Sequence, residues 1–326
     1  MTAVQVVRDP FTSGDVPRGG VISIGNYDGV HLGHQAILAR VVARARELGV
    51  PALAMTFDPH PLRLLDPERA PRLLTSLPQR LELLRRTGLD AALVVPFTAR
   101  LARTPAEEFV RDVLARRLDV REVYIGSGFR FGAEREGTVD LLVALGRELG
   151  FRAEGIPAVT VDGEPVSSTR IRRAVAHGDV ATAWRLLGRP LFVDGQVFRG
   201  VRLGRKLGFP TLNIAVENEL YPAHGVYVTG VHIPSFGRTF PSVTNIGVRP
   251  TLYENFSTTV ESHLLDFAAD VYRERVRLFF FERLREERVF PSPMALVAQI
   301  RRDVEASRGW FAAHPMEELD LVVPSA

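Results

Sequence analysis

The chain reads Gly25-Asn26-Tyr27-Asp28-Gly29-Val30-His31-Leu32-Gly33-His34 directly after a strand-like apolar run, residues 21–24. Beyond it, apolar residues recur at helical spacing from residue 37 to residue 48, which predicts an amphipathic helix. His31 and His34 are three apart at the start of that helix, so they share one face. The unpaired N–H groups and the positive dipole end of a helix start bind phosphate. The stretch therefore predicts a strand-to-helix turn that holds a nucleoside triphosphate.

Composition excludes several classes of protein. With 326 residues the chain exceeds a typical domain, so two domains are expected, and a hydrophobic fraction of 46% can fill their cores. The chain has no cysteine, which excludes disulfides and thiolate catalysis and fits a reducing cytoplasm. Its net charge of +3 comes without a block of like charges, and no apolar run is long enough to cross a bilayer. We therefore expect a cytoplasmic protein that acts on small molecules, with no nucleic-acid or membrane partner.

The first half alternates strand-like and helix-like segments. This alternation predicts a parallel sheet wrapped by helices, with ligands at the carboxyl ends of its strands. The run Thr104-Pro105-Ala106-Glu107 predicts a capping box, and Gly178 predicts a break in the last helix. The predicted strands span residues 21–25, 51–57, 91–96, 121–126 and 151–157. The predicted helices span residues 33–48, 76–87, 105–118, 138–149 and 168–187.

The second half consists of short β-like runs without intervening helices, which predicts a small antiparallel barrel. Ser292 and Pro293 begin a terminal helix that runs to about residue 306. We therefore predict an α/β chain of two domains: a nucleotide-binding parallel sheet with flanking helices over residues 1–188, and a barrel with a terminal helix over residues 189–326. The predicted strands of the barrel span residues 191–199, 211–216, 225–233, 239–246, 258–267 and 275–284.

A second phosphate-binding candidate is Val166-Ser167-Ser168-Thr169-Arg170-Ile171-Arg172. Hydroxyl groups at a helix start can donate to phosphate oxygens, and arginine offers a planar fork for a polyphosphate. The segment also fits an ordinary helix cap with surface arginines. Its occurrence in the same half as His31 and His34 favours the phosphate-binding interpretation.

The two histidines fit two further interpretations. A His-x-x-His pair can ligate zinc, with Asp58 and His60 as further ligands, but the glutamate of the metalloprotease signature is missing. Buried histidines with a purely structural role are the other alternative. We favour phosphate chemistry, in which the histidines donate to an α-phosphate whose charge builds up in the transition state.

The loop over residues 200–213 is the candidate site of the second half. Its glycines and basic residues, among them the sole lysine Lys206, suit a backbone cradle for phosphates. Thr211 and Asn213 are two apart on an extended segment, which places two oxygen ligands for Mg²⁺ on one side. A basic hairpin loop is the alternative. Glu261 lies in a strand-like run, where it is either exposed to solvent or a general base for phosphoryl transfer.

Three motifs of the first half resemble the bacterial bifunctional riboflavin kinase/FMN adenylyltransferase (FAD synthetase) family: residues 25–34, Phe57-Asp58-Pro59-His60-Pro61 and residues 167–172. The resemblance implies a nucleotidyltransferase-type domain that transfers AMP from ATP to FMN and releases pyrophosphate. It implies three groups of site residues. Asn26, His31 and His34 would bind and activate the ATP phosphates; Ser168, Thr169 and Arg172 would hold the polyphosphate; Asp58, His60 and Pro61 would lie near the flavin.

The second half resembles the riboflavin kinase module of the same family in residues 204–213, 245–251 and 260–262. The resemblance implies a barrel in which Thr211 and Asn213 bind Mg²⁺ and ATP. It also implies that Glu261 accepts the proton of the ribityl 5′-hydroxyl and that the loop contacts the nucleotide through Gly204, Arg205, Lys206 and Gly208. The resemblance also implies a possible homo-oligomer, either a trimer or a hexamer.

One position departs from the family pattern. Where the family has Asp or Asn before the first Phe of a Gly-x-Asp/Asn-Phe-x-Phe-Gly run, this chain has Gly128. A second hypothesis is therefore a riboflavin kinase whose adenylyltransferase is impaired or altered. Two remoter hypotheses are a non-catalytic flavin- or nucleotide-binding regulator and an aminoacyl-tRNA synthetase-like enzyme. The latter usually needs a lysine-rich phosphate loop, which a chain with one lysine lacks.

Overall fold

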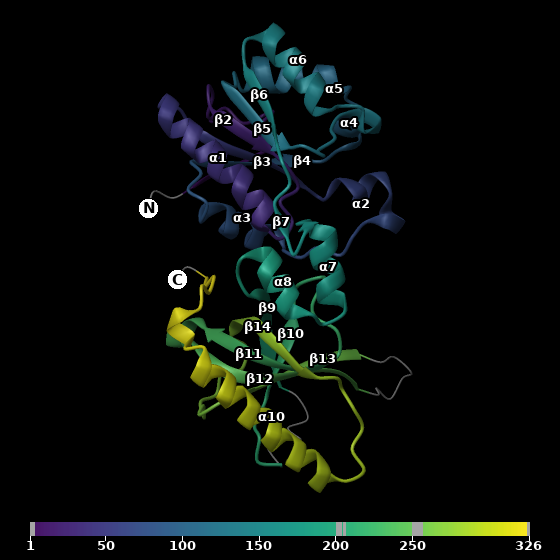
Figure 1. Ribbon diagram of the computed structural model, residues 1–326, viewed down its shortest axis with the longest axis vertical. Coiled ribbons are helices and arrows are strands. Elements are labelled where there is room, and N and C mark those ends of the chain that lie inside the picture. The colour runs from purple at the N-terminus through teal and green to yellow at the C-terminus, as the bar shows by residue number, and fades with distance from the viewer. Residues whose placement is uncertain (1–3, 200–203, 205–206, 250–256, 325–326) are drawn as a thin grey trace. The chain divides into compact units, whose positions relative to one another are not determined.

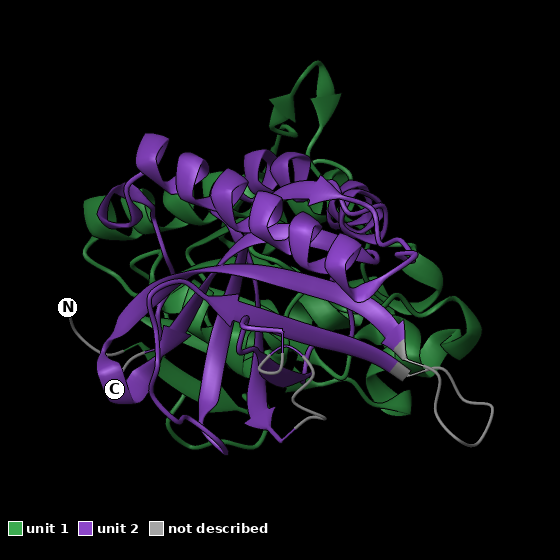
Figure 2. Cartoon of the chain, turned by 90° about the horizontal axis from the view of Figure 1, so that it is seen from below, with its two compact units in different colours: residues 1–167 green, residues 168–326 purple. Residues whose placement is uncertain are grey.

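The computed structural model describes residues 4–199, 204, 207–249 and 257–324. Its contacts divide the chain into two compact units, Met1–Ser167 and Ser168–Ala326, which Figure 2 shows in two colours. We describe each unit by itself. The helical segment 168–187 clusters with the second unit, whereas our domain boundary at residue 188 places it with the first domain; the functional boundary remains a prediction.

The first unit contains a six-stranded sheet in the order β1-β4-β3-β2-β5-β6 (Figure 1), and all its neighbouring strands are parallel. This confirms the predicted α/β fold and its five strands; β1 is a sixth that we did not predict. The chain leaves β2 toward β3 on one side and later adds β5 on the other side, so β2 and β5 flank the topological switch point. The strands are β1 (Gln5–Arg8), β2 (Val21–Ile24), β3 (Ala52–Asp58), β4 (Ala91–Pro96), β5 (Glu122–Gly126) and β6 (Arg152–Ile156).

Helices cover the sheet on both faces, as the predicted alternation requires. The side of α1 that packs on the sheet carries Leu38, Val41, Val42 and Ala45, all buried. The α-helices are α1 (Leu32–Leu48), α2 (Pro61–Leu65), α3 (Leu77–Arg85), α4 (Ala99–Ala102), α5 (Ala106–Glu108) and α6 (Val139–Leu149). The described part of the unit also has two 3₁₀-helices, η1 (Pro67–Arg69) and η3 (Ala133–Arg135), and one π-helix, η2 (Phe109–Arg117). A small hairpin pairs β7 (Thr160–Val161) with β8 (Glu164–Pro165).

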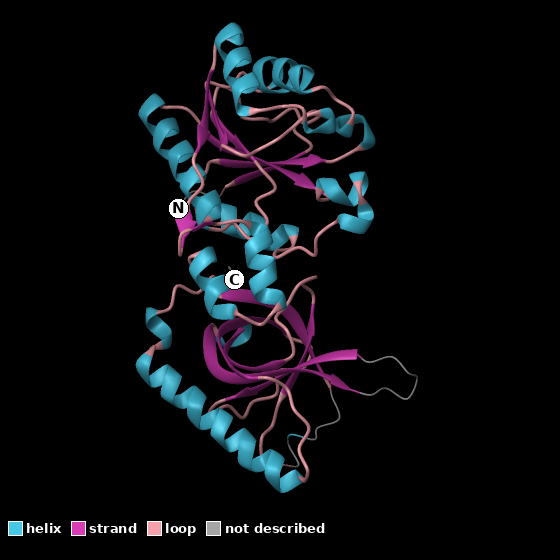
Figure 3. Cartoon of the chain, turned by 45° about the vertical axis from the view of Figure 1, so that its right-hand side comes forward, coloured by secondary structure: helices cyan, strands magenta, loops and turns pink. Residues whose placement is uncertain are grey.

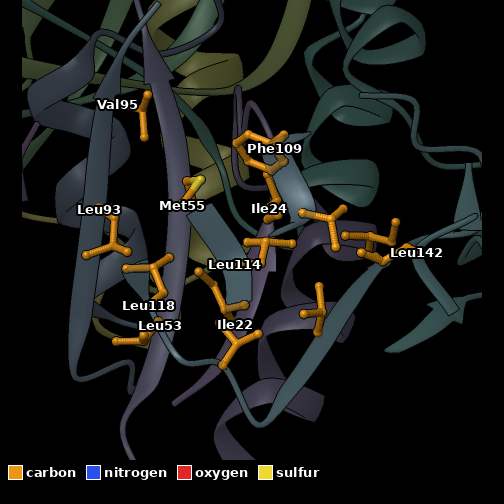
Figure 4. Close-up of a cluster of buried hydrophobic side chains, with 14 of the residues drawn as sticks. Ile22, Ile24, Leu53, Met55, Leu93, Val95, Phe109, Leu114, Leu118 and Leu142 are labelled. Carbon is orange, nitrogen blue, oxygen red and sulfur yellow. The ribbon is translucent and has the colours of Figure 1, made fainter. Parts of the chain in front are cut away.

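The core of the first unit lies between the sheet and the helices η2 and α6 (Figure 4). Alternate residues of β2, β3 and β4 point to this face, and Phe109, Leu114 and Leu142 come from the helices. These side chains are at most 9% exposed. The strands are thereby fixed in register, which also fixes where their carboxyl ends place the following loops.

The predicted capping box at residue 104 is wrong. The hydroxyl of Thr104 donates to the carbonyl of Arg100 in the preceding helix α4, and α5 begins at Ala106 without a local side-chain cap. Glu136, distant in sequence, accepts the Ala106 N–H instead at 2.8 Å. The structure has a capping box at α3, where Ser76 and Gln79 bond each other's backbone N–H groups.

The second unit is a closed barrel preceded by two helices and followed by a long one (Figure 3). The predicted break at Gly178 is confirmed, because this left-handed residue separates α7 (Ser168–Ala176) from α8 (Val180–Leu187). The strands run antiparallel in the closed order β10-β13-β12-β11-β14-β9, which confirms the predicted barrel. They are β9 (Leu191–Phe198), β10 (Leu212–Val216), β11 (Gly225–Ile233), β12 (Arg238–Arg249), β13 (Ser257–Leu264) and β14 (Arg275–Arg285).

The terminal helix α10 (Pro293–Ala313) begins at the predicted Ser292 cap and lies against β12 and β11 on the outside of the barrel (Figure 3). Near its end, Trp310 stacks on Phe281 of β14 with ring centroids 5.0 Å apart. Trp184 of α8 contacts the same phenylalanine at 5.9 Å. Phe281 therefore ties both flanking helices to the barrel. Short turns at η4 (Pro234–Phe236) and η5 (Met316–Glu318) complete the described elements.

Candidate active sites

The loop between β2 and α1 carries the two motif histidines at the switch point of the sheet. His31 is the N-cap of α1, and its Nδ1 accepts the backbone N–H of His34 at 3.4 Å. The two imidazole rings stack with centroids 3.6 Å apart and 18° between their planes. The structure thus brings the histidines together at a helix N-terminus, as the sequence predicted.

His34 is half-buried, whereas the side chain of His31 is 6% exposed. The Nδ1 of His34 is buried and, within the described residues, has no hydrogen-bond partner. Tyr27 meets the ring edge-on at 5.2 Å. Burial, the neighbouring His31 and the guanidinium of Arg80 together hold the pKa of His34 well below its usual range. A neutral imidazole still donates one N–H, so His34 can serve as a donor to an anion at neutral pH.

The buried carboxylate of Asp28 binds this loop to the segment that precedes α3. Asp28 is 1% exposed and accepts the N–H groups of Leu74 and Thr75 and the hydroxyl of Thr75, each at 3.0–3.1 Å. The same hydroxyl accepts the Gly29 N–H at 3.1 Å. The loop also contains Val30 at φ 39°, a left-handed conformation that is strained for a β-branched residue. Strain of this kind persists where surrounding contacts fix the backbone, as they do here.

Beside the loop lies a cavity of about 690 Å³ in the first unit. Asn26, His60 and Pro61 line it, and the Asn26 side-chain amide lies 3.2 Å from His60 Nε2. Asp58, which we grouped with them, is exposed and is not among the lining residues. Five aromatic side chains contribute to the remaining wall: Phe57, Phe97, Phe109, Phe129 and Phe131. An apolar cavity with few polar groups suits a large planar ligand.

Gly128 lies on the wall of this cavity. A β-carbon added there would meet no atom within 4 Å, and the residue is not in the left-handed region. The position therefore has room for a side chain that this chain does not carry.

The predicted polyphosphate contacts lie in the second unit. Ser168, Thr169 and Arg172 occupy the first turns of α7, where their spacing of three and four residues places them on one face. Ser168 and Arg172 are half-buried and Thr169 is exposed. Their contact with a nucleotide remains a prediction.

Two cavities of the second unit meet at Thr211. One, of about 390 Å³, is lined by Thr211, Asn213 and the segment 267–272; the other, of about 300 Å³, lies between the barrel and α10. Asn213 is 5% exposed, and its Oδ1 has no hydrogen-bond partner among the described residues. Burial of a carbonyl oxygen without a hydrogen-bond partner costs folding free energy. This cost is removed when a cation or a hydrogen-bond donor binds, so the Asn213 side chain is suited to binding a ligand.

The barrel register places Glu261 in a row of polar residues. Glu261 of β13 pairs with Asn213 of β10 on one side and with Asn245 of β12 on the other. Residues directly opposite on antiparallel strands point to the same face. Glu261 is half-buried and lines the smaller cavity together with Thr211 and Asn245, rather than facing open solvent.

Helix α10 supplies the other wall of the smaller cavity. Asp303 of α10 is 5% exposed and accepts three hydrogen bonds at 2.8–3.1 Å from Arg285 of β14. Gln299 donates to the same carboxylate at 2.8 Å. These charge-assisted bonds fix α10 over the barrel face that carries Glu261.

The predicted phosphate loop is described in part. The Gly204 carbonyl accepts the N–H groups of Leu207 and Phe209, and a β-carbon at Gly204 would lie 2.4 Å from the Phe209 carbonyl, so the turn requires glycine. Gly208 adopts φ 87°. Arg205 and Lys206 lie outside the described residues, and their predicted contacts stay predictions.

The sequence analysis assigned no site role to several residues that line the cavities. They are Asn245, Arg285, Asp303 and the phenylalanines around Gly128. Within residues 4–199, 204, 207–249 and 257–324, no three His, Cys, Asp or Glu side chains gather in a way that could hold a metal ion. In those same ranges every helix is too short or too polar to cross a membrane.

Comparison with known proteins gives two family matches. The sequence model of the family described as FAD synthetase matches residues 14–170, and the one described as riboflavin kinase matches residues 187–311. A Pseudomonas fluorescens protein named bifunctional riboflavin kinase/FMN adenylyltransferase is 43% identical over 309 residues, which cover 95% of this chain and 98% of that protein. The Escherichia coli K12 protein of the same name is 37% identical and covers 94% of this chain and 98% of that protein.

A solved structure has the same fold throughout. It comes from Streptococcus pneumoniae, is described as a macrolide-efflux protein, and superposes on 94% of this chain and 99% of its own with a TM-score of 0.86 at 28% identity.

Proposed function

This chain belongs to the family of bifunctional riboflavin kinase/FMN adenylyltransferases, and on that premise we propose which of its residues carry each reaction. It is an enzyme with two activities, phosphorylating riboflavin to FMN and adenylylating FMN to FAD. The single observation that carries the assignment is the match of two separate family descriptions to consecutive stretches, 14–170 and 187–311. We assign adenylyl transfer to residues 1–188 and the kinase to residues 189–326.

In the adenylyl transfer, an oxygen of the FMN phosphate attacks the α-phosphorus of ATP, and pyrophosphate leaves. We assign to Asn26, His31 and His34 the binding of the ATP phosphates, because they lie at a helix N-terminus at the switch point of the sheet. The histidines donate to the α-phosphate as its charge builds up. The cavity beside them takes the flavin, with His60 and Pro61 in its wall. Asp58 is exposed and does not line the cavity, and its place near the flavin stays a prediction. Ser168, Thr169 and Arg172 hold the polyphosphate.

In the kinase reaction, the ribityl 5′-hydroxyl attacks the γ-phosphorus of ATP, and ADP leaves. Glu261 accepts the hydroxyl proton, a role supported by its place in the wall of the smaller cavity and by its pairing with Asn213, which lines the other cavity. The smaller cavity takes riboflavin, and the one with Asn213 takes ATP. We also assign nucleotide contacts to Gly204, Arg205, Lys206 and Gly208, although Gly204 lines the smaller cavity. The carboxylate then loses its proton to solvent.

Mg²⁺ belongs to this proposal as the companion of ATP. Its fit rests on the donor set: the Thr211 hydroxyl and the buried Asn213 Oδ1, for which the described residues offer no partner, are hard oxygen ligands. Thr211 and Asn213 would hold the ion, which when bound neutralises phosphate charge.

The chain incubated with riboflavin, ATP and Mg²⁺ is expected to form FMN first and then FAD, separable by chromatography over time. Removal of divalent cations with EDTA should abolish both products, because triphosphate charge is then uncompensated, and added Mg²⁺ should restore them. Absence of any phosphorylated flavin from the complete mixture would refute the function. An unchanged rate in EDTA would refute the metal assignment alone.

Gly128→Asn is expected to increase the rate of FAD formation from FMN by about tenfold. This is the effect of one additional hydrogen bond between the asparagine side chain and FMN. The open space at Gly128 accepts the side chain without a clash. FMN formation should not change. Gly128→Ala is the matched control, since it adds the β-carbon without a polar group. Equal rates in both variants and in the unmodified chain would show that Gly128 does not limit the acceptor site.

A cytoplasmic location and a homo-oligomer complete the proposal. The substrates ATP, riboflavin and FMN are small metabolites, which supports the location; cell fractionation tests it. Light scattering on the purified chain distinguishes a monomer from a trimer or hexamer.

A further inference from the structure

A buried guanidinium lies under the nucleotide loop of the first unit. Arg80 belongs to α3 and is 1% exposed. Its NH1 donates to two oxygens of β3, the Thr56 hydroxyl at 3.2 Å and the Phe57 carbonyl at 3.1 Å. A buried cation is costly unless its donors are satisfied, so a residue that keeps one here needs an explanation beyond packing.

Thr56 relays this contact to the loop. Its hydroxyl donates to the Asn26 carbonyl at 3.1 Å. A hydroxyl has one donor and two acceptor positions, so it can accept from Arg80 and donate to Asn26 at the same time. The bond from Arg80 thereby directs the Thr56 proton toward Asn26, whose side chain lies against His60 in the cavity wall.

The segment that leads into α3 holds the same loop at a second point. Thr75, which directly precedes the Ser76 cap, binds Asp28 and Gly29. Two sets of hydrogen bonds therefore connect the β2–α1 loop to α3 and the segment before it. One runs from Arg80 through Thr56 to Asn26, and the other joins Thr75 to residues 28–29. A shift of α3 would therefore move the loop at both of these points.

We propose that Arg80 is a positioning residue of the adenylyltransferase: its buried guanidinium, acting through Thr56 on Asn26, holds the loop over residues 25–34 in the form that binds ATP and the flavin acceptor. This inference rests on the function proposed for the first unit and goes beyond it. Arg80 is buried and does not line the cavity, so we assign it no direct contact with substrate. The charge of Arg80 has a second effect. Together with burial and the neighbouring His31, it lowers the pKa of His34 and so helps to keep that imidazole neutral. The rings of His31 and Tyr27 contact the same imidazole.

The test compares four variants of the full chain. Arg80→Met removes both the fork and the charge, Arg80→Lys keeps the charge, and Thr56→Val removes only the relay. Arg85→Met is the matched control, an exposed arginine of the same helix. The kinase rate, measured on the same samples, reports the amount of intact protein independently of the first unit.

Arg80→Met is expected to lower kcat/KM for FAD formation by about 10²-fold, the effect of a misplaced catalytic group. Thr56→Val should lower it by about tenfold, the worth of one hydrogen bond. Arg80→Lys should recover part of the loss, and Arg85→Met should match the unmodified chain. The kinase rate should not change in any of them.

The pH profile separates positioning from mere loss of folded protein. With the charge removed in Arg80→Met, the pKa of His34 rises, so the acid limb of FAD formation should move to higher pH; Arg80→Lys and Thr56→Val should leave it in place. A smaller folded fraction cannot move this limb. Full FAD formation by Arg80→Met, or a loss without a shifted limb and with Thr56→Val fully active, would overturn the inference. An unmodified chain that makes FMN but no FAD would instead refute the function of the first unit, and the inference with it.

Discussion

Replacing His31 by alanine is expected to stop FAD formation while riboflavin phosphorylation continues at the unmodified rate. His31 stacks on His34 at the N-terminus of α1, the place to which we assign the ATP phosphates. Loss of one donor to a developing phosphate charge costs about 10²–10³ in kcat, or about 2.7–4 kcal/mol. The riboflavin kinase family matches residues 187–311, and none of the residues that we propose for the kinase site lies in the first unit.

The alanine variant also loses the N-cap, whose removal costs about 1 kcal/mol of stability. His31→Asn separates the two effects, because asparagine caps a helix as well as histidine does here but lacks the imidazole. Both variants should accumulate FMN without FAD in a chromatographic time course from riboflavin and ATP. Loss of FMN formation with FAD formation from supplied FMN intact would show that the activities are assigned to the wrong halves.

Glu261→Gln should produce the opposite phenotype. FMN formation from riboflavin should fall by about 10²–10⁴-fold, the usual worth of a general base, whereas FAD formation from supplied FMN should persist. Glutamine keeps the volume and one acceptor oxygen beside Asn213 and Asn245, so the barrel row remains packed. Only the capacity to take the proton of the substrate hydroxyl is lost.

Glu282→Gln is the matched control, since it removes an exposed carboxylate from another strand of the same barrel. It should leave both rates unchanged. A Glu261→Gln chain that still forms FMN at the unmodified rate would rule out Glu261 as the base. Equal losses in both variants would point to a change in barrel stability instead.

Much of the first site was predictable because its determinants are local. The order strand, glycine-rich turn, helix is written in consecutive residues, and the spacing of His31 and His34 places them on one helical face. The predicted strands and the break at Gly178 follow from periodicity and from glycine's left-handed φ. The strand β1 was missed because Gln5–Arg8 is too short to show alternation, and it pairs only with the distant β4.

The cavities were not predictable because their walls converge from distant segments. Alternation along β13 assigns Glu261 to the outer face of the barrel but cannot reveal that α10 covers that face through Arg285 and Asp303. The phenylalanines around Gly128 come from separate loops and elements of the first unit. The cap at Ala106 fails for the same reason, since Glu136 replaces the local partner.

The packing on Phe281 has a practical consequence for spectroscopy. Trp184 and Trp310 are the only two tryptophans of the chain, and both contact this one ring of the barrel unit. Indole emission is therefore an optical signal of residues 168–326 alone. A denaturant titration followed by emission reports the melting of the barrel, while circular dichroism on the same sample also registers the parallel sheet. The difference between the two curves isolates the unit that has no intrinsic fluorophore of this kind.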